Sequence, residues 1–481
     1  MKMRQRILVL MAVVATVVAS TGRLFADDTN AAPAATVDDK INRLEQEIQD
    51  LKQQRELDQQ QAQQQAQHAA VQAAQQAKSA SIISTGPESF RFRSADSNFV
   101  VRIGGYAQAD GRFYLGDRAN NGVDTFLMRR VRPILEGTFY QDFDFRIMTD
   151  FGNGAAASSL LQDAYLEWHH WSWLKIRAGK FKPPVGLEQL MSDTDLIFME
   201  RGLPTDLVPQ RDVGVQVSGD LLDGTVNYAG GVFNELVDGA IGDLDTGDAK
   251  DAAGRIFIQP FKTTEISPLQ GFGFGAAGTI GDHTFTSSTT NLPTYKTTGQ
   301  LTFFSYRSGV ADDGTELRGT PQAYYYYGPF NLLGEYAVSE QEVRTGTYRD
   351  NLHNSAWQVE GGFFLTGEEA RYRGSPYNPA YALTPRHPFN LAAGGWGAFE
   401  IAARYGELRI DPDAFSHFAD PTKSAQEARE WGVGINWYPN RNVKLSLDYE
   451  QTVFDGGAGT TTAPNNRETE EDMFGRVQLQ F

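Results

Sequence analysis

The feature that most constrains the fold is an alternation of apolar and polar residues that begins after Pro87 and continues to the C-terminus. Residues 101–110, 143–151 and 443–450 show it clearly, because every second side chain in them is apolar or small. Side chains on a β-strand point alternately to its two faces, so each segment predicts a strand with one apolar face. A helical membrane protein is excluded beyond the first residues, because the only long apolar run, Ile7–Ala19, is shorter than the roughly 20 residues that a spanning helix needs.

The connections between the segments distinguish a membrane barrel from a soluble β-sandwich. About sixteen segments follow one another, and short turns alternate with long loops. The short turns are expected at 140–142, 171–173, 221–224, 328–331 and 438–441, and the long loops at 182–210, 235–252, 282–317 and 455–470. Outer-membrane barrels have an even strand number, short periplasmic turns and long outer loops. The sequence therefore predicts an all-β fold, a 16-stranded antiparallel transmembrane β-barrel over residues 87–481.

Two segments need special places in this barrel. Thr302–Tyr306 has the pattern of a strand but must lie inside an outer loop if the last strand is to end in the periplasm. Residues 368–394 form a long connection on the side of the short turns, and we expect a packed inward segment there.

The two ends of the chain indicate export to the outer membrane. Residues 1–26 have the parts of a secretory signal peptide: the basic residues Lys2, Arg4 and Arg6, the apolar core, and a cleavage site before residue 27. The final segment is amphipathic and ends in Phe481, which is typical of the assembly signal of outer-membrane barrels; an ordinary edge strand is the alternative.

Residues 27–86 differ from the rest, and we expect them to form a periplasmic coiled coil with its linker. Apolar residues occupy the a and d positions of two heptads, and a Gln/Ala-rich stretch follows before Ser84–Pro87 end the segment. The apolar positions are Ile41, Leu44, Ile48 and Leu51. A partly helical tether, disordered elsewhere, is the alternative.

Composition excludes several classes of function. The chain has no Cys, which excludes disulfides, Cys-ligated metals and thiol nucleophiles. Its net charge of −17 argues against a nucleic acid partner, because phosphate binding requires a basic surface. No nucleophile–base arrangement stands out, so we expect neither an enzyme nor a cofactor, although a barrel hydrolase is kept as a third hypothesis.

Five stretches stand out in order along the chain: Arg129–Arg132, Ala178–Glu188, Arg211–Gly214, Tyr326–Phe330 with Gly334–Tyr336, and Gly397–Tyr405. Together they resemble the phosphate-selective porin O/P family of outer-membrane channels. The resemblance covers about residues 90–481. It implies a trimeric porin in outer-membrane lipid, with long loops folded into the lumen and passive diffusion of small hydrophilic solutes or ions, anions such as phosphate among them.

The resemblance implies that Arg129 and Arg130 help to bind anions. On a regular strand only one of two neighbours faces inward, so both could do so only at a bulge or a rim. Arg132 shares the inward phase of Arg130, and the basic track is expected to extend through Arg102, Arg112, Lys175 and Arg177. Guanidinium groups in a narrow lumen attract anions. The alternative is a salt-bridge network that braces the wall through Asp110, Glu136, Asp142 and Asp144.

A constriction loop is expected after Phe181, because Pro183 and Pro184 cannot continue a strand ladder and no alternation follows up to Arg211. Its charged candidates are Lys180, Lys182, Glu188, Asp193, Asp195 and Arg201. Phosphate-specific family members have lysines at this constriction, whereas this loop carries aspartates. A general channel, or one for a different solute, is therefore an equal alternative.

The remaining candidate sites are weak. Asp243, Asp245, Asp248 and Asp251 are read as a solvated acidic loop rather than a calcium site, and His169 and His170 as part of an interfacial aromatic belt rather than metal ligands. No metal is expected. As a second function, the barrel would anchor the protein while the coiled coil binds the cell wall.

Overall fold

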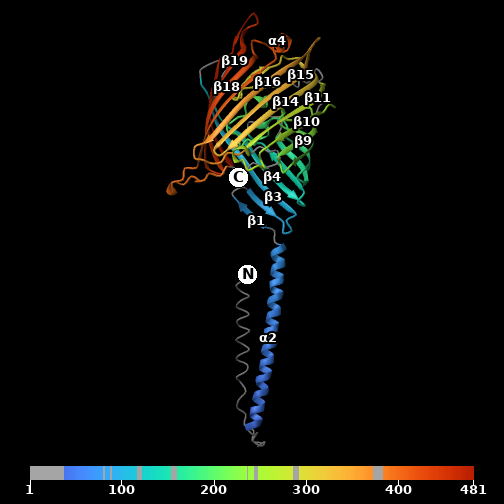
Figure 1. Cartoon of the computed structure of the whole chain (residues 1–481), viewed down its shortest axis with the longest axis vertical. Coiled ribbons are helices and arrows are strands. Elements are labelled where there is room, and N and C mark those ends of the chain that lie inside the picture. Colours follow the sequence, from blue (N-terminus) through green and yellow to red (C-terminus); the bar gives the residue numbers. More distant parts are fainter. Residues whose placement is uncertain are drawn as a thin grey trace. The chain divides into compact units, whose positions relative to one another are not determined.

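The computed structural model describes residues 37–79, 82–86, 89–115, 122–152, 160–235, 237–242, 248–284, 292–371 and 383–481. The signal peptide and the linker expected at 1–26 and 27–36 lie outside this part. The chain divides between Lys78 and Ser79 into two compact units, one containing a long helix and the other a large β-sheet (Figure 1).

The helix α2 (Val37–Ser79) has 43 residues, with Asp38 and Asp39 in its first turn, where negative charge favours a helix. Its side chains are exposed from Val37 to Gln72, including the four apolar heptad residues. The predicted helix is confirmed, while the coiled coil stays a prediction. Among the described residues, no helix combines the length and apolar character needed to cross a membrane.

Within the described residues, sixteen antiparallel strands form a closed barrel, as the sequence predicted. In chain order they are β3 (Phe99–Tyr114), β4 (Thr125–Phe139), β5 (Phe143–Thr149), β6 (Leu161–Trp171), β7 (Leu174–Phe181), β8 (Asp212–Leu221), β9 (Val226–Phe233), β10 (Asp251–Ile258), β11 (Phe272–Thr284), β14 (Ala311–Tyr327), β15 (Phe330–Thr345), β16 (Tyr348–Phe364), β17 (Ala398–Arg409), β18 (Ala425–Asn440), β19 (Val443–Thr460) and β21 (Glu470–Gln480). The last strand pairs with the first, from Asp472 opposite Tyr114 to Gln480 opposite Tyr106.

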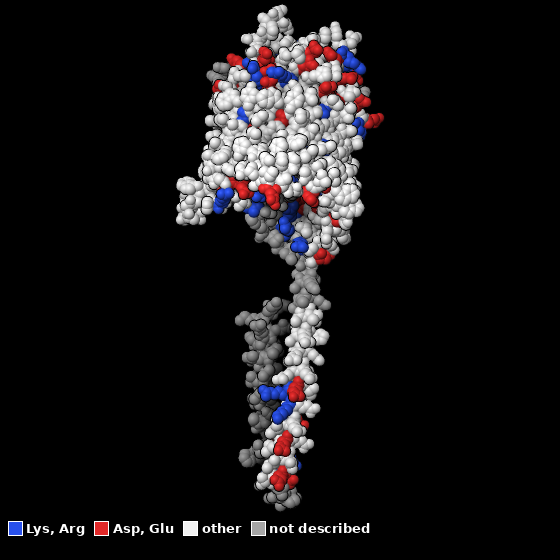
Figure 2. Space-filling view, in the orientation of Figure 1, with Lys and Arg blue, Asp and Glu red and all other residues white. Residues whose placement is uncertain are grey.

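Each strand separates an apolar outer face from a polar inner face. On β15, Leu332 and Tyr336 are exposed, whereas Asn331, Glu335 and Ser339 are buried inside the barrel. Figure 2 shows the result: a band of the barrel surface carries almost no charged side chains, and charged residues gather at its two rims. This is the surface that a lipid-embedded barrel requires.

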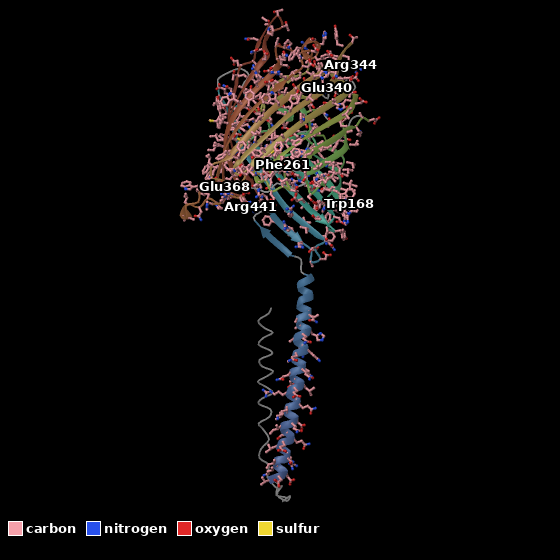
Figure 3. All side chains as sticks on the ribbon, viewed as in Figure 1. Trp168, Phe261, Glu340, Arg344, Glu368 and Arg441 are labelled. Atoms are coloured by element: carbon pink, nitrogen blue, oxygen red, sulfur yellow. The ribbon has the colours of Figure 1, made fainter. Side chains whose placement is uncertain are left out.

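Most short turns lie at one end of the barrel and most long loops at the other, with the two-residue β15–β16 turn and the long β16–β17 connection as exceptions. The turns after β4, β6, β8, β14 and β18 leave only two to four residues between strands, and Figure 3 places Trp168, Glu368 and Arg441 at this end and Glu340 and Arg344 at the other. Inside the long β11–β14 connection, β12 (Thr294–Lys296) pairs with β13 (Thr302–Ser305). The predicted strand inside an outer loop is therefore present.

The remaining elements are short. They are β1 (Ile82–Gly86), β2 (Ser89–Arg93), α3 (Leu187–Leu190), η1 (Leu203–Leu207), η2 (Ser267–Leu269), η3 (Leu391–Ala393), α4 (Ala414–His417) and β20 (Ala463–Asn466). The β1–β2 hairpin pairs with β3 at residues 100–103, next to the part of β3 that pairs with β21. Residues 82–86, which the sequence assigned to the linker, thus belong to the sheet.

Outer connections pack inside the barrel as a hydrophobic cluster. Leu203 and Leu207 meet Phe303 and Phe304 of the β11–β14 connection and Phe418 of the β17–β18 connection. The lumen is therefore partly filled by protein on the side of β15–β19.

The connection between β16 and β17 differs from the packed inward segment expected at 368–394. Its two ends pack inward, because Ala370 and Leu383 are buried against Phe364 and Ala398. Residues 386–394 are exposed instead, and 372–382 lie outside the described residues.

Candidate functional site

The connection between β7 and β8, residues 182–211, crosses the barrel and is called the inward loop below. Its backbone carbonyls accept hydrogen bonds from the opposite wall. The donors are Arg404 to Glu200 O (2.9 Å), Asn436 to Ile197 O (2.8 Å), Lys444 to Leu196 O (2.6 Å) and Arg476 to Met199 O (2.5 Å). These bonds hold the inward loop across the lumen from β7 to β17–β21, so the loop narrows the passage.

A β-bulge in β4 turns two adjacent arginines toward this loop. In the pairing of β3 with β4, Gln108 lies opposite Arg130 and Ala109 lies opposite Met128, which leaves Arg129 as the extra residue. Arg129 donates from Nε and Nη2 to Glu200 (2.6 and 2.9 Å), and Arg130 donates to Glu200 Oε2 (3.3 Å). The bulge thus meets the condition under which both side chains can face inward.

Glu200 of the inward loop is the meeting point of four guanidinium groups. Besides Arg129 and Arg130, Arg112 of β3 lies 2.6 Å and Arg476 of β21 lies 3.1 Å from Glu200 Oε1. Burial disfavours the charged carboxylate, but the four arginines outweigh this cost and hold the pKa of Glu200 well below its usual value. Glu200 therefore stays ionised at physiological pH.

Asp193 of the inward loop is a second meeting point. Arg132 of β4 pairs with it, as does Arg201 at 2.5 Å, and Tyr106 donates its hydroxyl at 2.9 Å. Burial raises the pKa of Asp193, yet the surrounding guanidinium groups, Arg130 among them, hold it well below the usual value.

Together these residues form the arginine cluster, in which positive charge exceeds negative charge. Its members are Arg112, Arg129, Arg130, Arg132, Arg201 and Arg476, paired with Asp110, Asp150, Asp193 and Glu200. Six guanidinium groups against four carboxylates leave an excess of two positive charges within this group of described residues. A further anion can approach the cluster without meeting net repulsion.

A cavity of about 290 Å³ opens beside the arginine cluster. It lies between the inward loop and the β9–β10 and β11–β14 connections. Its charged lining residues are Arg129, Arg130, Glu200, Arg201, Asp206, Asp238 and Lys296. At roughly 30 Å³ per water molecule, this space holds a small solute with part of its hydration shell.

Asp206, on the wall of this cavity, is a titratable group. Burial raises its pKa to about 7, although the Lys296 backbone N–H donates to Asp206 Oδ2 at 2.8 Å and favours the charged form. The charge of the cavity therefore depends on pH near neutrality.

Three of the basic residues predicted to line the pore lie outside the cluster, in ion pairs that brace the wall. Arg102 pairs with Glu136 (2.8 Å), Lys175 with Asp220 (2.9 Å), and Arg177 with Glu167 (2.8 Å). Ion pairing that braces the wall describes these three residues, whereas anion binding by Arg112, Arg129, Arg130 and Arg132 at the constriction stays a prediction.

Two predicted loop residues hold the shape of the inward loop. Lys182 donates to the carbonyls of Gln189 and Met191, both at 2.7 Å, and Glu188 accepts from Gly202 N at 2.9 Å. Lys180 is buried at the end of β7, and Asp195 lines a second, smaller cavity of about 40 Å³ together with Lys444.

The sequence prediction missed Arg476, Asp150 and Glu200. The alternation of the last strand places Arg476 on its polar face, so the strand phase could have identified Arg476 as a pore-facing residue. Glu200 lies in a loop without periodicity, and only the path of the chain brings it to the arginines.

The weak candidates lie elsewhere. His169 is 3.3 Å from Asp144 and His170 is 3.0 Å from Asp142 at the β6–β7 turn, beside the stacked rings of Trp171 and Trp173. Of the acidic loop, Asp243 and Asp245 lie outside the described residues, Asp248 is exposed, and Asp251 is buried in the barrel.

Known proteins resemble this chain over the whole barrel. The family model for phosphate-selective porin O and P matches residues 101–481. Porin O of Pseudomonas aeruginosa is 23% identical over 418 residues, which covers 78% of this chain and 88% of that protein. The outer membrane channel DcaP of Acinetobacter baumannii is 12% identical, with a TM-score of 0.51 over 81% of this chain and 99% of that one. An anion-selective porin from Comamonas acidovorans has a TM-score of 0.48 and 12% identity over 80% and 100% of the two chains.

Proposed function

The chain belongs to the phosphate-selective porin O and P family, and from this premise we propose that it is a passive channel whose arginine cluster favours small anions. As a member of this family with a closed 16-stranded barrel, it is a porin of the outer membrane. The observation that carries the anion preference is the excess of guanidinium groups over carboxylates where the inward loop narrows the lumen.

The positive electrostatic potential of the arginine cluster attracts anions, and the binding is weak enough for them to dissociate. Asp193 and Glu200 occupy part of the guanidinium donors, so a passing anion competes with resident carboxylates. A site that binds weakly suits a channel, because conduction requires both entry and release. Since both carboxylates stay ionised at physiological pH, the excess of the cluster stays at two positive charges and does not grow.

The solutes are proposed to be small anions in general, phosphate among them. Three acidic residues, Glu200, Asp206 and Asp238, line the cavity beside the four basic ones. This mixed lining favours a channel with a moderate preference for anions over cations. A site that recognises one anion strictly would be expected to have fewer carboxylates.

The reversal potential across a planar bilayer under a salt gradient tests the proposal. The wild-type channel is expected to show anion preference, and Arg130→Gln is expected to lower the anion-to-cation permeability ratio roughly two- to twentyfold, since one charge acting over about 10 Å contributes on the order of 0.4–1.7 kcal/mol. Arg102→Gln is the matched control, because Arg102 also faces the lumen but pairs with Glu136 outside the cluster. Anion preference that is unchanged in Arg130→Gln contradicts the role given to this arginine.

The porin is further proposed to be a homotrimer whose helices α2 associate in the periplasm. The support is the apolar a/d positions, since Ile41, Leu44, Ile48 and Leu51 are 46–62% exposed in the single chain. Association of three copies would bury these side chains.

A further inference from the structure

A second charged cluster lies inside the barrel, at the long-loop ends of β10, β11 and β14. It contains His283, Asp312 and Glu316, with Asp251 and Arg318 beside them, and each side chain is at most 5% exposed. None of these residues belongs to the arginine cluster or to the lining of its cavity, so the proposed function leaves this second cluster unexplained.

The contacts of the His283 ring suggest what the cluster is built to hold. Nε2 lies 3.0 Å from Asp251 Oδ1, while Nδ1 lies 2.8 Å from Asp312 Oδ2 and 3.0 Å from Glu316 Oε2. A neutral imidazole carries one proton. When Nε2–H donates to Asp251, the Nδ1 lone pair faces two carboxylate oxygens, and these three acceptors repel one another unless a positive charge lies among them.

The charges around His283 do not balance. Asp238 of the β9–β10 connection brings the carboxylates that lie within 3.3 Å of His283 or Arg318 to four, against Arg318 and a protonated His283. Two positive charges against four negative ones leave an excess of two negative charges within this buried group of described residues. Such burial is costly without a compensating cation.

Asp312 Oδ1 is one of the carboxylate oxygens of the second cluster that accept no hydrogen bond among the described residues. The Asp312 side chain is fully buried. Native proteins rarely leave a buried carboxylate oxygen in this state, and an ion is one of the standard explanations.

We propose that His283, Asp312 and Glu316 bind a divalent metal cation of the Zn²⁺ or Mn²⁺ class. One ligand atom from each residue lies within 4.8 Å of the other two, and imidazole nitrogen with carboxylate oxygen is a set that these metals accept. Asp251 orients the imidazole through Nε2–H, the carboxylate–histidine arrangement that is common behind metal-binding histidines.

A metal at this place joins the ends of two barrel strands and neutralises the carboxylates between them. Asp238 links the second cluster to the outer connections, because it pairs with Arg318 (2.5 Å) and accepts from the Tyr295 hydroxyl (3.1 Å). The metal is therefore expected to stabilise the barrel and its outer connections.

Metal content and thermal unfolding of the purified full-length porin test the proposal. After chelation and dialysis against Zn²⁺ or Mn²⁺ alone, about one metal ion per chain is expected by elemental analysis, with a rise in the unfolding temperature. Asp312→Asn is expected to weaken metal binding at least tenfold and to remove the rise. Asp282→Asn is the matched control, because Asp282 is the exposed neighbour of His283 and accepts from Thr315 instead (2.8 Å).

Cobalt spectroscopy provides a readout that does not depend on stability. Co²⁺ bound through His283 is expected to give visible absorption bands, and these bands should disappear in His283→Gln. This second variant keeps the test valid if Asp312→Asn does not fold. Absence of stoichiometric metal in the wild-type protein, or metal binding that both variants retain, overturns the proposal. The former result would mean that protons neutralise the cluster.

Discussion

Glu200 sets the charge of the constriction, because its single carboxylate receives four guanidinium groups. Removing one partner of a buried ion pair leaves the other charge uncompensated, and this cost is larger than the net stabilisation by the pair itself. The arginines of the cluster are thus held in position by carboxylates that also limit how strongly they attract a solute.

Glu200→Gln is expected to raise the anion-to-cation permeability ratio roughly two- to twentyfold, because the excess of positive charge grows by one at about 10 Å from the path. Reversal potentials under a salt gradient measure the ratio. Glu136→Gln is the control, since Glu136 pairs with Arg102 and Arg146 away from the cluster. An equal ratio in wild-type protein and Glu200→Gln would show that the path does not pass the cluster.

Asp206 is expected to make selectivity depend on pH. Its pKa is raised to about 7 by burial, so the carboxyl is neutral below that pH and charged above it. Anion selectivity should therefore increase as the pH falls from about 8 to about 6, and Asp206→Asn should show the high selectivity throughout. A wild-type pH profile that Asp206→Asn leaves unchanged would assign the dependence to another group.

The raised pKa of Asp206 also predicts how this group changes the free energy of unfolding with pH. Because the folded state raises the pKa of Asp206 above its unfolded value, this group favours folding most at low pH. Its contribution decreases as the pH rises from the unfolded pKa of about 3.9 through the folded pKa of about 7.

At the scale of elements, the inward loop and the β4 bulge act together. The bulge brings Arg129 and Arg130 to the same face, and the loop brings Glu200 and Asp193 to meet them. Hydrogen bonds from β17, β18, β19 and β21 hold the loop in place. Neither element forms the constriction alone.

Deletion of residues 37–79 separates the helix from the channel function. Single-channel conductance of the barrel is expected to persist, because the helix and the barrel are separate compact units. Chemical cross-linking is expected to yield fewer trimers, since the apolar heptad positions are lost. A protein that keeps its trimers contradicts the role of α2 in assembly, and loss of cell-wall association with normal conductance would support the tether hypothesis.

At the scale of the whole molecule, closure of the barrel depends on its final residues. The backbone N–H of Phe481 donates to Gly105 O (3.0 Å), and Gly105 N donates back to Phe481 O (2.9 Å). These bonds extend the β21–β3 pairing to the last residue, while the Phe481 side chain is half-exposed on the outer surface.

Removal of Phe481 is expected to lower the amount of folded barrel in the outer membrane severalfold. The reasons are that the closing pair loses two hydrogen bonds and that the aromatic residue predicted to act as the assembly signal is absent. The heat-dependent shift in gel mobility of isolated membranes measures the folded fraction. Phe481→Tyr, which keeps the ring and the backbone, is the control, and equal folded fractions after deletion would contradict the role of this residue.

Much of the fold could be predicted from the sequence, because its signals are local. Apolar residues recur with a period of two along a strand and at heptad positions along a helix, and a turn interrupts the pattern briefly. The sixteen strands, α2 and the strand inside an outer loop could therefore all be predicted. The β1 strand was missed, since five residues after a helix carry too little periodicity to distinguish a strand from a linker.

The site was predicted in part. Arg112, Arg130 and Arg132 follow from strand phase, Arg129 from the family resemblance, and Asp193 and Arg201 from the loop that contains them. The pairing of the strand arginines with the inward loop was not predictable, because Arg112, Arg129 and Arg132 lie 61 to 88 positions from their loop partners and Arg476 lies 276 positions from Glu200.

The sequence by itself determined the class of this protein: a barrel with an apolar outer face, a polar lumen and one long loop that no strand pattern can accommodate. Only the tertiary structure decided which arginines form the constriction and which brace the wall, and it alone brought His283 to its carboxylates. The physical reason is that alternation specifies the face on which a side chain lies, whereas partners across a lumen are selected by strand register, a bulge and the path of a loop.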